Sequence, residues 1–348
     1  MSDKILSLIY TFSKKFTDPK TNLGFEPENN NISAIVKDGN VNIFLIVKGD
    51  EIDLYKDILR LLKNNIAQIP GVLSVNIALT SDKEKQRPEK KFKIDAKNII
   101  AIASGKGGVG KSTFSVNLSV ALKSIGMKVG LLDADIYGPS VPRMIGISKK
   151  PEMNENKKLI PVENYGVKCM SIGFILNDEA PTIWRGPMVM KALEQMFNGV
   201  EWGSLDYLII DLPPGTGDAQ LTLAQSSKLS GSIVISTPQE VALTDARKGI
   251  NMFKKVDVDI LGIVENMSYF ICDNCNQKHF IFSKDGAMKE AEKYNIQFLG
   301  RIPIDKKLRE QSDVGVPCCI EDPNDQISEI FISIAKKINQ SLNTKRSL

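Results

Sequence analysis

The sequence lacks the features that mark secreted and membrane-spanning proteins. Five cysteines in 348 residues are too few and too scattered for a disulfide framework. The longest apolar runs, such as IIAIA and YLIID, fall far short of the roughly 18 residues that a membrane span needs. The N-terminal stretch MSDKILSLIYTFSKKF has lysines among its apolar positions, no arginine and no small-residue cleavage site. We therefore expect a cytoplasmic protein in a reducing compartment.

An excess of charge of one sign is also missing. The 45 lysines and arginines nearly balance the 41 aspartates and glutamates, which leaves a net charge of +4. A nucleic-acid footprint would concentrate basic residues on one face, whereas here they are dispersed. We expect neither a nucleic-acid nor a membrane partner. The length exceeds the usual span of one hydrophobic core, so one full-sized domain and a smaller one are expected.

The composition changes twice along the chain. Residues 1–80 alternate helical and strand patterns and are interpreted as a small N-terminal α/β domain. Residues 81–97 are dense in charge and almost free of apolar side chains, which is typical of a solvated linker. Residues 98–348 alternate short, fully apolar runs with helical segments, and such strands are buried on both faces. The expected fold class is α/β, with a mainly parallel sheet covered by helices on both faces.

A phosphate-binding motif follows the first apolar run of the larger domain. The stretch SGKGGVGKST has the G-x-x-x-x-G-K-[ST] spacing, beginning at Gly105 and ending at Ser112. Its backbone N–H groups can surround phosphate oxygens, Lys111 can reach the outer phosphates, and the Ser112 hydroxyl can coordinate Mg²⁺. The flanking strand and helix patterns favour this P-loop NTPase interpretation over a glycine-rich turn. The nucleotide-binding residues expected from the loop are Gly105, Lys106, Gly107, Gly108, Val109, Gly110, Lys111, Ser112 and Thr113.

Aspartates follow two other apolar runs. LLDADIYGPS places Asp133 and Asp135 just past one strand, and YLIIDLPPGTGD places Asp211 at the end of another. Ligands of parallel sheets bind at the carboxyl ends of the strands. We therefore expect Asp135 to position the attacking water or engage Mg²⁺, and Asp211 to hold the metal's water shell. No N-K-x-D guanine signature occurs at an appropriate place, which favours ATP over GTP.

The pair Cys272 and Cys275 lies in FICDNCNQKHF, and the chain's only histidine, His279, follows. Alone, such a pair is compatible with a redox dithiol, half a zinc site, half a cluster site or a surface loop. A closed metal site needs about four ligands. His279, four residues beyond Cys275, could complete a ligand set, but a lone histidine is more often structural or solvated. The other cysteines are expected to be buried for packing, although the adjacent pair among them could contact a metal: Cys169, Cys318 and Cys319.

A second lysine in the loop, Lys106, is not needed for the ordinary motif. In KGGVGK it resembles the deviant phosphate loop of the family that includes nitrogenase iron protein, the septum-site and plasmid-partition ATPases and the Mrp-type iron–sulfur carriers. The resemblance implies that Lys106 crosses a dimer interface to the partner's nucleotide, as an arginine finger does. The expected catalytic residues are Lys106, Lys111 and Asp135. The resemblance also implies that Asn266 and Pro303 flank the adenine, although both could be turn residues.

Residues 202–218, WGSLDYLIIDLPPGTGD, resemble the Mrp/ApbC signature almost position for position, as do DADIYGPS and PTIWRGPMVMKAL. This resemblance covers about residues 95–340. It implies an ATPase whose homodimer holds a labile [4Fe-4S] cluster with Cys272 and Cys275 of each chain. The cluster would pass from scaffold proteins to apo-iron–sulfur proteins. The N-terminal stretch is similar to the domain that precedes the ATPase in many bacterial members, but it contains no cysteine.

Two other functions stay open at this point. A spatial-organising ATPase of the partition or septum-site kind shares the phosphate loop and Lys106 but needs neither the CxxC pair nor the DLPPGTGD loop. A dimeric ATPase bridged by zinc would use the same cysteines with a different metal.

Overall fold

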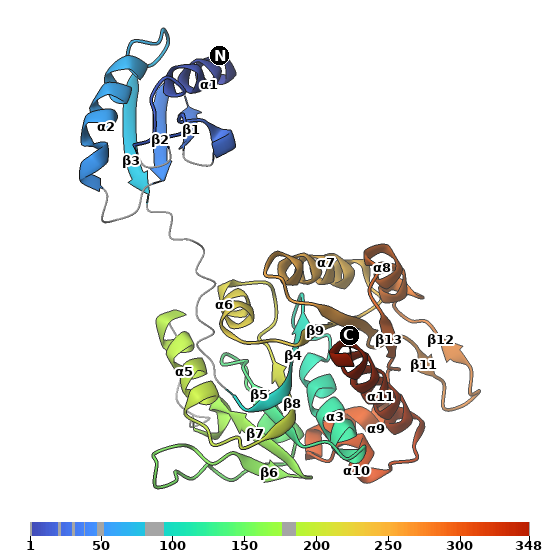
Figure 1. The fold of residues 1–348 in the computed structure, drawn as a ribbon. Coiled ribbons are helices and arrows are strands. Elements are labelled where there is room, and N and C mark those ends of the chain that lie inside the picture. The colour runs from blue at the N-terminus through green and yellow to red at the C-terminus, as the bar shows by residue number, and fades with distance from the viewer. Residues whose placement is uncertain are drawn as a thin grey trace. The chain divides into compact units, whose positions relative to one another are not determined.

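A computed structural model describes the greater part of the chain, which divides into two compact units, Met1–Arg87 and Pro88–Leu348 (Figure 1). Most of the expected linker over residues 81–97 lies outside the described residues, as does the beginning of the PTIWRGPMVMKAL stretch. The described residues are 2–19, 22–29, 32–37, 39–46, 52–80, 94–175 and 186–347.

The smaller unit is a three-stranded sheet covered by two helices. Strand β2 is antiparallel to β1 and parallel to β3. In α2, Tyr55, Leu62 and Ile66 recur at helical spacing and are all buried, so the helix turns one apolar stripe toward the sheet. The elements are α1 (Ser2–Ser13), η1 (Pro27–Asn29), β1 (Ile32–Lys37), β2 (Asn40–Ile46), α2 (Ile52–Ile66) and β3 (Ser74–Thr80).

The larger unit is built on an eight-stranded sheet with the order β13-β10-β9-β4-β8-β5-β7-β6. All neighbouring strands are parallel except β6 and β7, which are antiparallel. The predicted mainly parallel sheet is therefore confirmed. Its strands are β4 (Ala96–Ser104), β5 (Val129–Asp133), β6 (Val162–Asn164), β7 (Val167–Ser171), β8 (Leu205–Asp211), β9 (Gly231–Ser236), β10 (Ile260–Glu265) and β13 (Phe298–Arg301).

Helices cover both faces of this sheet (Figure 1). The chain steps one way along the sheet from β4 to β5 through α3, and the other way from β8 to β10 through α6 and α7. Because such crossovers are right-handed, opposite steps place their helices on opposite faces. Helix α11 packs on α3. The helices are α3 (Lys111–Ser124), α4 (Val141–Met144), η2 (Ile172–Phe174), α5 (Gly186–Asn198), α6 (Asp218–Ser226), α7 (Glu240–Lys255), α8 (Gly286–Tyr294), α9 (Lys306–Val314), α10 (Cys318–Glu321) and α11 (Gln326–Ser347).

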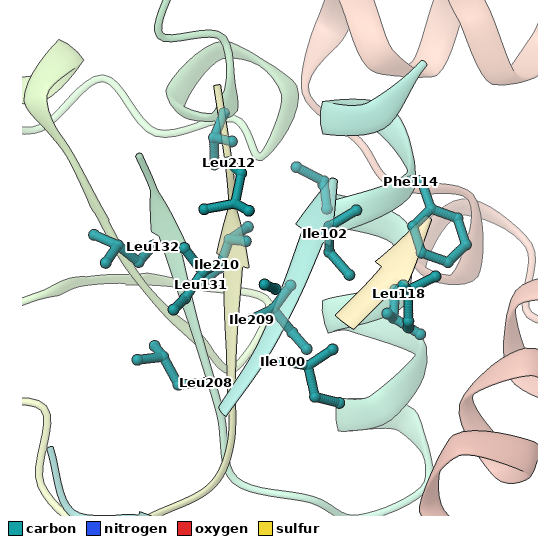
Figure 2. Close-up of a cluster of buried hydrophobic side chains, with 14 of the residues drawn as sticks. Ile100, Ile102, Phe114, Leu118, Leu131, Leu132, Leu208, Ile209, Ile210 and Leu212 are labelled. Atoms are coloured by element: carbon teal, nitrogen blue, oxygen red, sulfur yellow. The ribbon is translucent and has the colours of Figure 1, made fainter. Parts of the chain in front are cut away.

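The core lies around the central strands and fixes the start of the phosphate loop. Figure 2 shows side chains of β4 and its neighbours packed beside Phe114 and Leu118 of α3. Ile100 and Ile102 of β4 are fully buried, as the apolar run predicts. None of the helices in the described part of the chain combines the length and apolar character that crossing a bilayer requires.

Candidate functional site

The phosphate loop joins the end of β4 to the start of α3 in a conformation that requires glycine. Gly108 and Gly110 have φ values of +78° and +84°, in the left-handed region that favours glycine. A Cβ at Gly110 would also collide with the side-chain amide of Asn266. That amide donates a 2.8 Å hydrogen bond to the Val109 carbonyl. Asn266, which directly follows β10, therefore holds the phosphate loop through its contact with Val109.

The loop borders a cavity of about 200 Å³ at the carboxyl end of the sheet. It brings together most of the loop residues predicted from the sequence and Asp135, while Gly105 and Val109 do not line it. The lining residues are Ser104, Lys106, Gly107, Gly108, Gly110, Lys111, Ser112, Thr113, Asp135, Gly138, Ser140, Met144 and Pro214.

Three polar groups of α3 converge on the buried carboxylate of Asp211. The Lys111 ammonium lies 2.8 Å from Oδ1 of Asp211. The Ser112 hydroxyl donates to Oδ2 at 2.6 Å, and the Ser115 hydroxyl donates to Oδ1 at 2.7 Å. The Lys111 ammonium, expected to bind phosphate, and the Ser112 hydroxyl, expected to bind Mg²⁺, therefore contact the same carboxylate. A bound phosphate must compete with Asp211 for the Lys111 ammonium.

The two aspartates that follow β5 have different positions. Asp133 is fully buried and pairs in register with Asp211 of β8. Its burial, and then the charge of Asp211, raise the pKa of the Asp133 carboxyl to about 8. Its Oδ1 accepts the backbone N–H of Asp135 at 3.1 Å, and this contact orients the turn. Asp135 lines the cavity, and its burial raises the pKa of its carboxyl.

Lys106 differs from Lys111 in its surroundings. It is half-buried and lines the cavity, and no described carboxylate lies within ion-pairing distance of its ammonium. Its backbone carbonyl accepts a 2.9 Å hydrogen bond from the Ser104 hydroxyl, which fixes the backbone at this position. Among the described residues, the two lysines of the loop thus differ, because Lys111 pairs with a carboxylate and Lys106 does not.

The structure does not bring the two predicted adenine neighbours into this cavity. Asn266 is buried and contacts the outer side of the phosphate loop. Pro303 lines a separate cavity of about 370 Å³ that also includes Ile271 and Asp273, close to the cysteine pair. The contacts of Asn266 and Pro303 with a nucleotide base stay a prediction.

The cysteine pair lies in the turn of a short hairpin formed by β11 (Phe270–Ile271) and β12 (Lys278–His279). The Cys272 N–H donates to the Gln277 carbonyl at 3.1 Å, and the Asn276 N–H donates to the Cys272 carbonyl at 2.8 Å. Asn276 adopts a left-handed φ of +57°, which asparagine tolerates well. These contacts give the turn that carries the cysteine pair a defined backbone.

The hairpin gathers three metal-ligating side chains. The ligand atoms of Cys272, Cys275 and His279 all lie within 4.8 Å of one another. Cys275 and His279 are exposed, and Cys272 is half-buried. The backbone N–H groups of Cys275 and then Asn274 lower the pKa of the Cys272 thiol and favour its thiolate. The sequence left the role of His279 open, and the pairing of β11 with β12 is what brings this residue to the cysteines.

The remaining cysteines lie in the core. Cys169 is 0% exposed, Cys318 2% and Cys319 4%. Burial raises the pKa of the Cys169 thiol well above its usual value. The sulfurs of Cys318 and Cys319 lie 3.9 Å apart, and the Cys318 N–H donates to the side chain of Asn117 in α3.

Iodoacetamide is therefore expected to separate the five cysteines into two classes. Under native, oxygen-free conditions it should alkylate Cys272 and Cys275 at least tenfold faster than the buried thiols, because exposure and thiolate character control the rate. Peptide mapping by mass spectrometry measures the extent at each site. All five should react in denaturant, and native labelling of Cys169 at the rate of Cys275 would contradict the burial of Cys169 in the core.

The loop glycines offer a matched pair for testing the backbone geometry. A Cβ at Gly105 would collide with the backbone of Asp245, whereas a Cβ at Gly107 meets nothing within 4 Å. We expect Gly105→Ala to lower the free energy of unfolding by about 1–3 kcal/mol, and Gly107→Ala to change it by less than about 0.5 kcal/mol. Urea unfolding of the nucleotide-free protein measures both, and equal effects would contradict the close approach at Gly105.

Comparison with known proteins connects this geometry to a family. A family model described as ParA, NUBPL iron-transfer P-loop NTPase, matches residues 95–339. The chain is 54% identical over 251 residues to an Arabidopsis thaliana protein named iron-sulfur protein required for NADH dehydrogenase, mitochondrial; the match covers 72% of this chain and 80% of that protein. It is 40% identical over 337 residues to an iron-sulfur cluster carrier protein of Synechocystis sp., covering 95% of this chain and 96% of the relative.

A solved structure agrees with the fold of the larger unit. A nucleotide-binding protein from Archaeoglobus fulgidus, in complex with ADP, superposes with a TM-score of 0.59 at 41% sequence identity. The match covers 68% of this chain and 93% of that one. The likeness to the Synechocystis protein extends further and includes the smaller N-terminal unit.

Proposed function

The chain belongs to the NUBPL family of iron-transfer P-loop NTPases, and from that membership we propose that it is an ATP-hydrolysing iron–sulfur cluster carrier. It receives a labile [4Fe-4S] cluster from scaffold proteins, holds it at a homodimer interface in the cytoplasm, and delivers it to apo-proteins. The observation that carries this proposal is the exposed hairpin with Cys272 and Cys275, since cysteine thiolates are the usual ligands of such clusters.

The need for four thiolates supports a dimer. One hairpin supplies two of the four that a [4Fe-4S] cluster takes, and a second copy related by a two-fold axis supplies the others. Beside the cysteines, Phe280, Ile281 and Phe282 are 39%, 59% and 39% exposed. Neighbouring exposed apolar side chains are typical of protein interfaces. They support a contact between the hairpin and another chain or a recipient protein.

The phosphate-loop cavity would bind the triphosphate of ATP with its Mg²⁺. Magnesium prefers hydroxyl, carboxylate and water oxygens in octahedral geometry. Ser112 and Asp135 line the cavity, and the fully buried Asp211 has a carboxylate oxygen 2.6 Å from the Ser112 hydroxyl, so these three residues would hold the ion directly or through water. Bound there, the ion would neutralise phosphate charge. Lys111 would bind the outer phosphates, and Asp135 would position the attacking water.

Lys106 would act on the nucleotide of the second chain. Its side chain lies at the cavity without a described carboxylate partner, in contrast to Lys111. A cation that reaches the transferring phosphoryl group from another chain stabilises charge in the transition state. Turnover would then depend on the dimer that the cluster also requires.

One short segment of the chain, residues 266–272, joins the two sites. Asn266 holds the phosphate loop through Val109, and the same segment runs on to Cys272. Along it, the Ser268 N–H donates to the Ile302 carbonyl at 3.0 Å, and the Ser268 hydroxyl donates to the buried Glu265 at 2.5 Å. Through this segment, a change of the loop on ATP hydrolysis would alter how the hairpin exposes the cluster.

Cluster delivery tests the proposal. Protein loaded with ferrous iron and sulfide without oxygen should restore the activity of an apo-enzyme that needs a [4Fe-4S] cluster, and do so faster than equal free iron and sulfide. No advantage over the free ions would contradict a carrier function. Metal analysis after oxygen-free purification separates the zinc-bridged alternative, which requires one zinc per two chains in place of iron. The names of relatives at 40–54% identity do not favour the spatial-organising alternative.

A further inference from the structure

The position of His279 gives one chain a third metal ligand. We propose that Cys272, Cys275 and His279 of a single chain form a mononuclear site for a thiophilic divalent cation, Zn²⁺ or Fe²⁺, with the fourth coordination position open. This site shares its cysteines with the proposed cluster site. It requires neither ATP, sulfide nor a second chain, so it can be tested separately.

The hairpin, and not closeness in the sequence, brings the three ligands together. A fully extended chain from Cys275 to His279 would span about 13 Å. Instead, the turn closed by Cys272 and Gln277 reverses the chain, and His279 pairs with Phe270 across the hairpin. The base of the hairpin is attached to the rest of the unit, since Phe270 forms a parallel bridge with Ile304. The backbone therefore holds the three side chains near one another before a metal binds.

The separation of the ligand atoms is close to that of a tetrahedral site. Zn–S bonds of about 2.3 Å and Zn–N bonds of about 2.0–2.1 Å place ligand atoms roughly 3.5–3.8 Å apart. In the hairpin the three ligand atoms lie within 4.8 Å of one another. Rotations of the exposed side chains by a small amount can close the remaining gap without moving the backbone.

The donor set selects the metal and leaves it exchangeable. Two thiolates and a neutral imidazole balance a 2+ charge, and these donors favour Zn²⁺, Fe²⁺ or Co²⁺ over Mg²⁺ and Ca²⁺. Cys275 and His279 are exposed, so solvent or a fourth ligand can reach the metal. Three protein ligands with an open position are typical of reactive sites, in contrast to closed structural sites. In the described part of the chain, no other group of three or more such side chains meets these distances.

Titration with Co²⁺ under oxygen-free, reducing conditions tests the site on the full-length protein. Thiolate-to-cobalt charge-transfer bands and tetrahedral d–d bands should appear and saturate at one ion per chain. His279→Gln, which keeps side-chain bulk but removes the imidazole, should raise the Kd more than about tenfold and shift the d–d bands, since even outer-shell partners of a metal are worth about 10–100-fold. Gln277→Ala is the matched control, because it changes an exposed side chain of the same turn and should leave Kd and bands unchanged.

Because His279 is the only histidine, its imidazole NMR signals need no assignment. One equivalent of Zn²⁺ should shift them in the unaltered protein, which makes the test independent of how any variant folds. Unshifted signals, unchanged Co²⁺ binding by His279→Gln, or saturation at one ion per two chains would each overturn the proposal. Failure of cluster loading with an intact Co²⁺ site would instead count against the carrier function alone.

Discussion

Lys106→Ala is expected to reduce the kcat for ATP hydrolysis by about 10³-fold or more, the range that an arginine finger supplies in related phosphoryl transfer. The Kd for ATP should change by less than about threefold, because the phosphates keep Lys111 and the loop N–H groups of their own chain. A loss of 10³-fold corresponds to about 4 kcal/mol of transition-state stabilisation. Steady-state kinetics and equilibrium binding of a fluorescent ATP analogue separate the two quantities.

Complementation between two inactive variants tests whether Lys106 acts on the other chain. Lys111→Ala should lose ATP binding, since Lys111 is the buried cation of the loop, yet its Lys106 remains. In a mixed dimer, the Lys111→Ala chain supplies its Lys106 to the ATP bound by the Lys106→Ala chain. Half of randomly paired dimers are mixed, and each has one active site of two, so about a quarter of the turnover of the unaltered protein should return. Absence of recovery in verified mixed dimers, or unchanged kcat in Lys106→Ala, would remove the cross-chain role.

Cys275→Ser is expected to abolish cluster binding, with iron content after anaerobic loading falling at least tenfold. A serine hydroxyl stays protonated at neutral pH and is a poor substitute for a thiolate, so a dimer would keep two of its four ligands. Because Cys275 is exposed, the free energy of unfolding should change by less than about 0.5 kcal/mol. Iron and sulfide analysis with the cluster absorbance measures the loss.

Cys169→Ala is the matched control for that substitution. It also removes a thiol, but from β7 in the core, where the side chain is 0% exposed. It should retain the full cluster while losing some stability, through the small cavity left in the core. A full cluster in Cys275→Ser or Cys272→Ala, or an equal loss in Cys169→Ala, would show that the hairpin thiols are not the ligands.

The parts of the site that could be predicted from the sequence depend on local patterns. The phosphate loop is contiguous, so its spacing and flanking apolar runs indicated both the strand before it and the helix after it. Asp135 and Asp211 were placed by a similar argument, because the ends of parallel strands share one edge of the sheet. The structure contains the predicted sheet. Asp135 lines the cavity, and Asp211 contacts Lys111 and Ser112.

Features that depend on distant pairing could not be predicted in this way. The order β4-β8-β5 sets Asp133 beside Asp211, and burial, followed by this neighbour, raises the pKa of Asp133. Asn266 meets Val109, which lies far away in the sequence. His279 reaches the cysteines through a hairpin with strands of two residues, too short to leave a periodic pattern. Sequence spacing specifies the end of a strand, but not which strand lies beside it.

The central claim is that one cluster is shared by two chains through their hairpins. Native mass spectrometry of the anaerobically loaded protein tests it most directly. We predict a species of two chains with one four-iron, four-sulfide cluster, which is absent when Cys275→Ser protein is loaded in the same way. A complete cluster on a single chain, or a dimer that carries zinc and no iron, would contradict it.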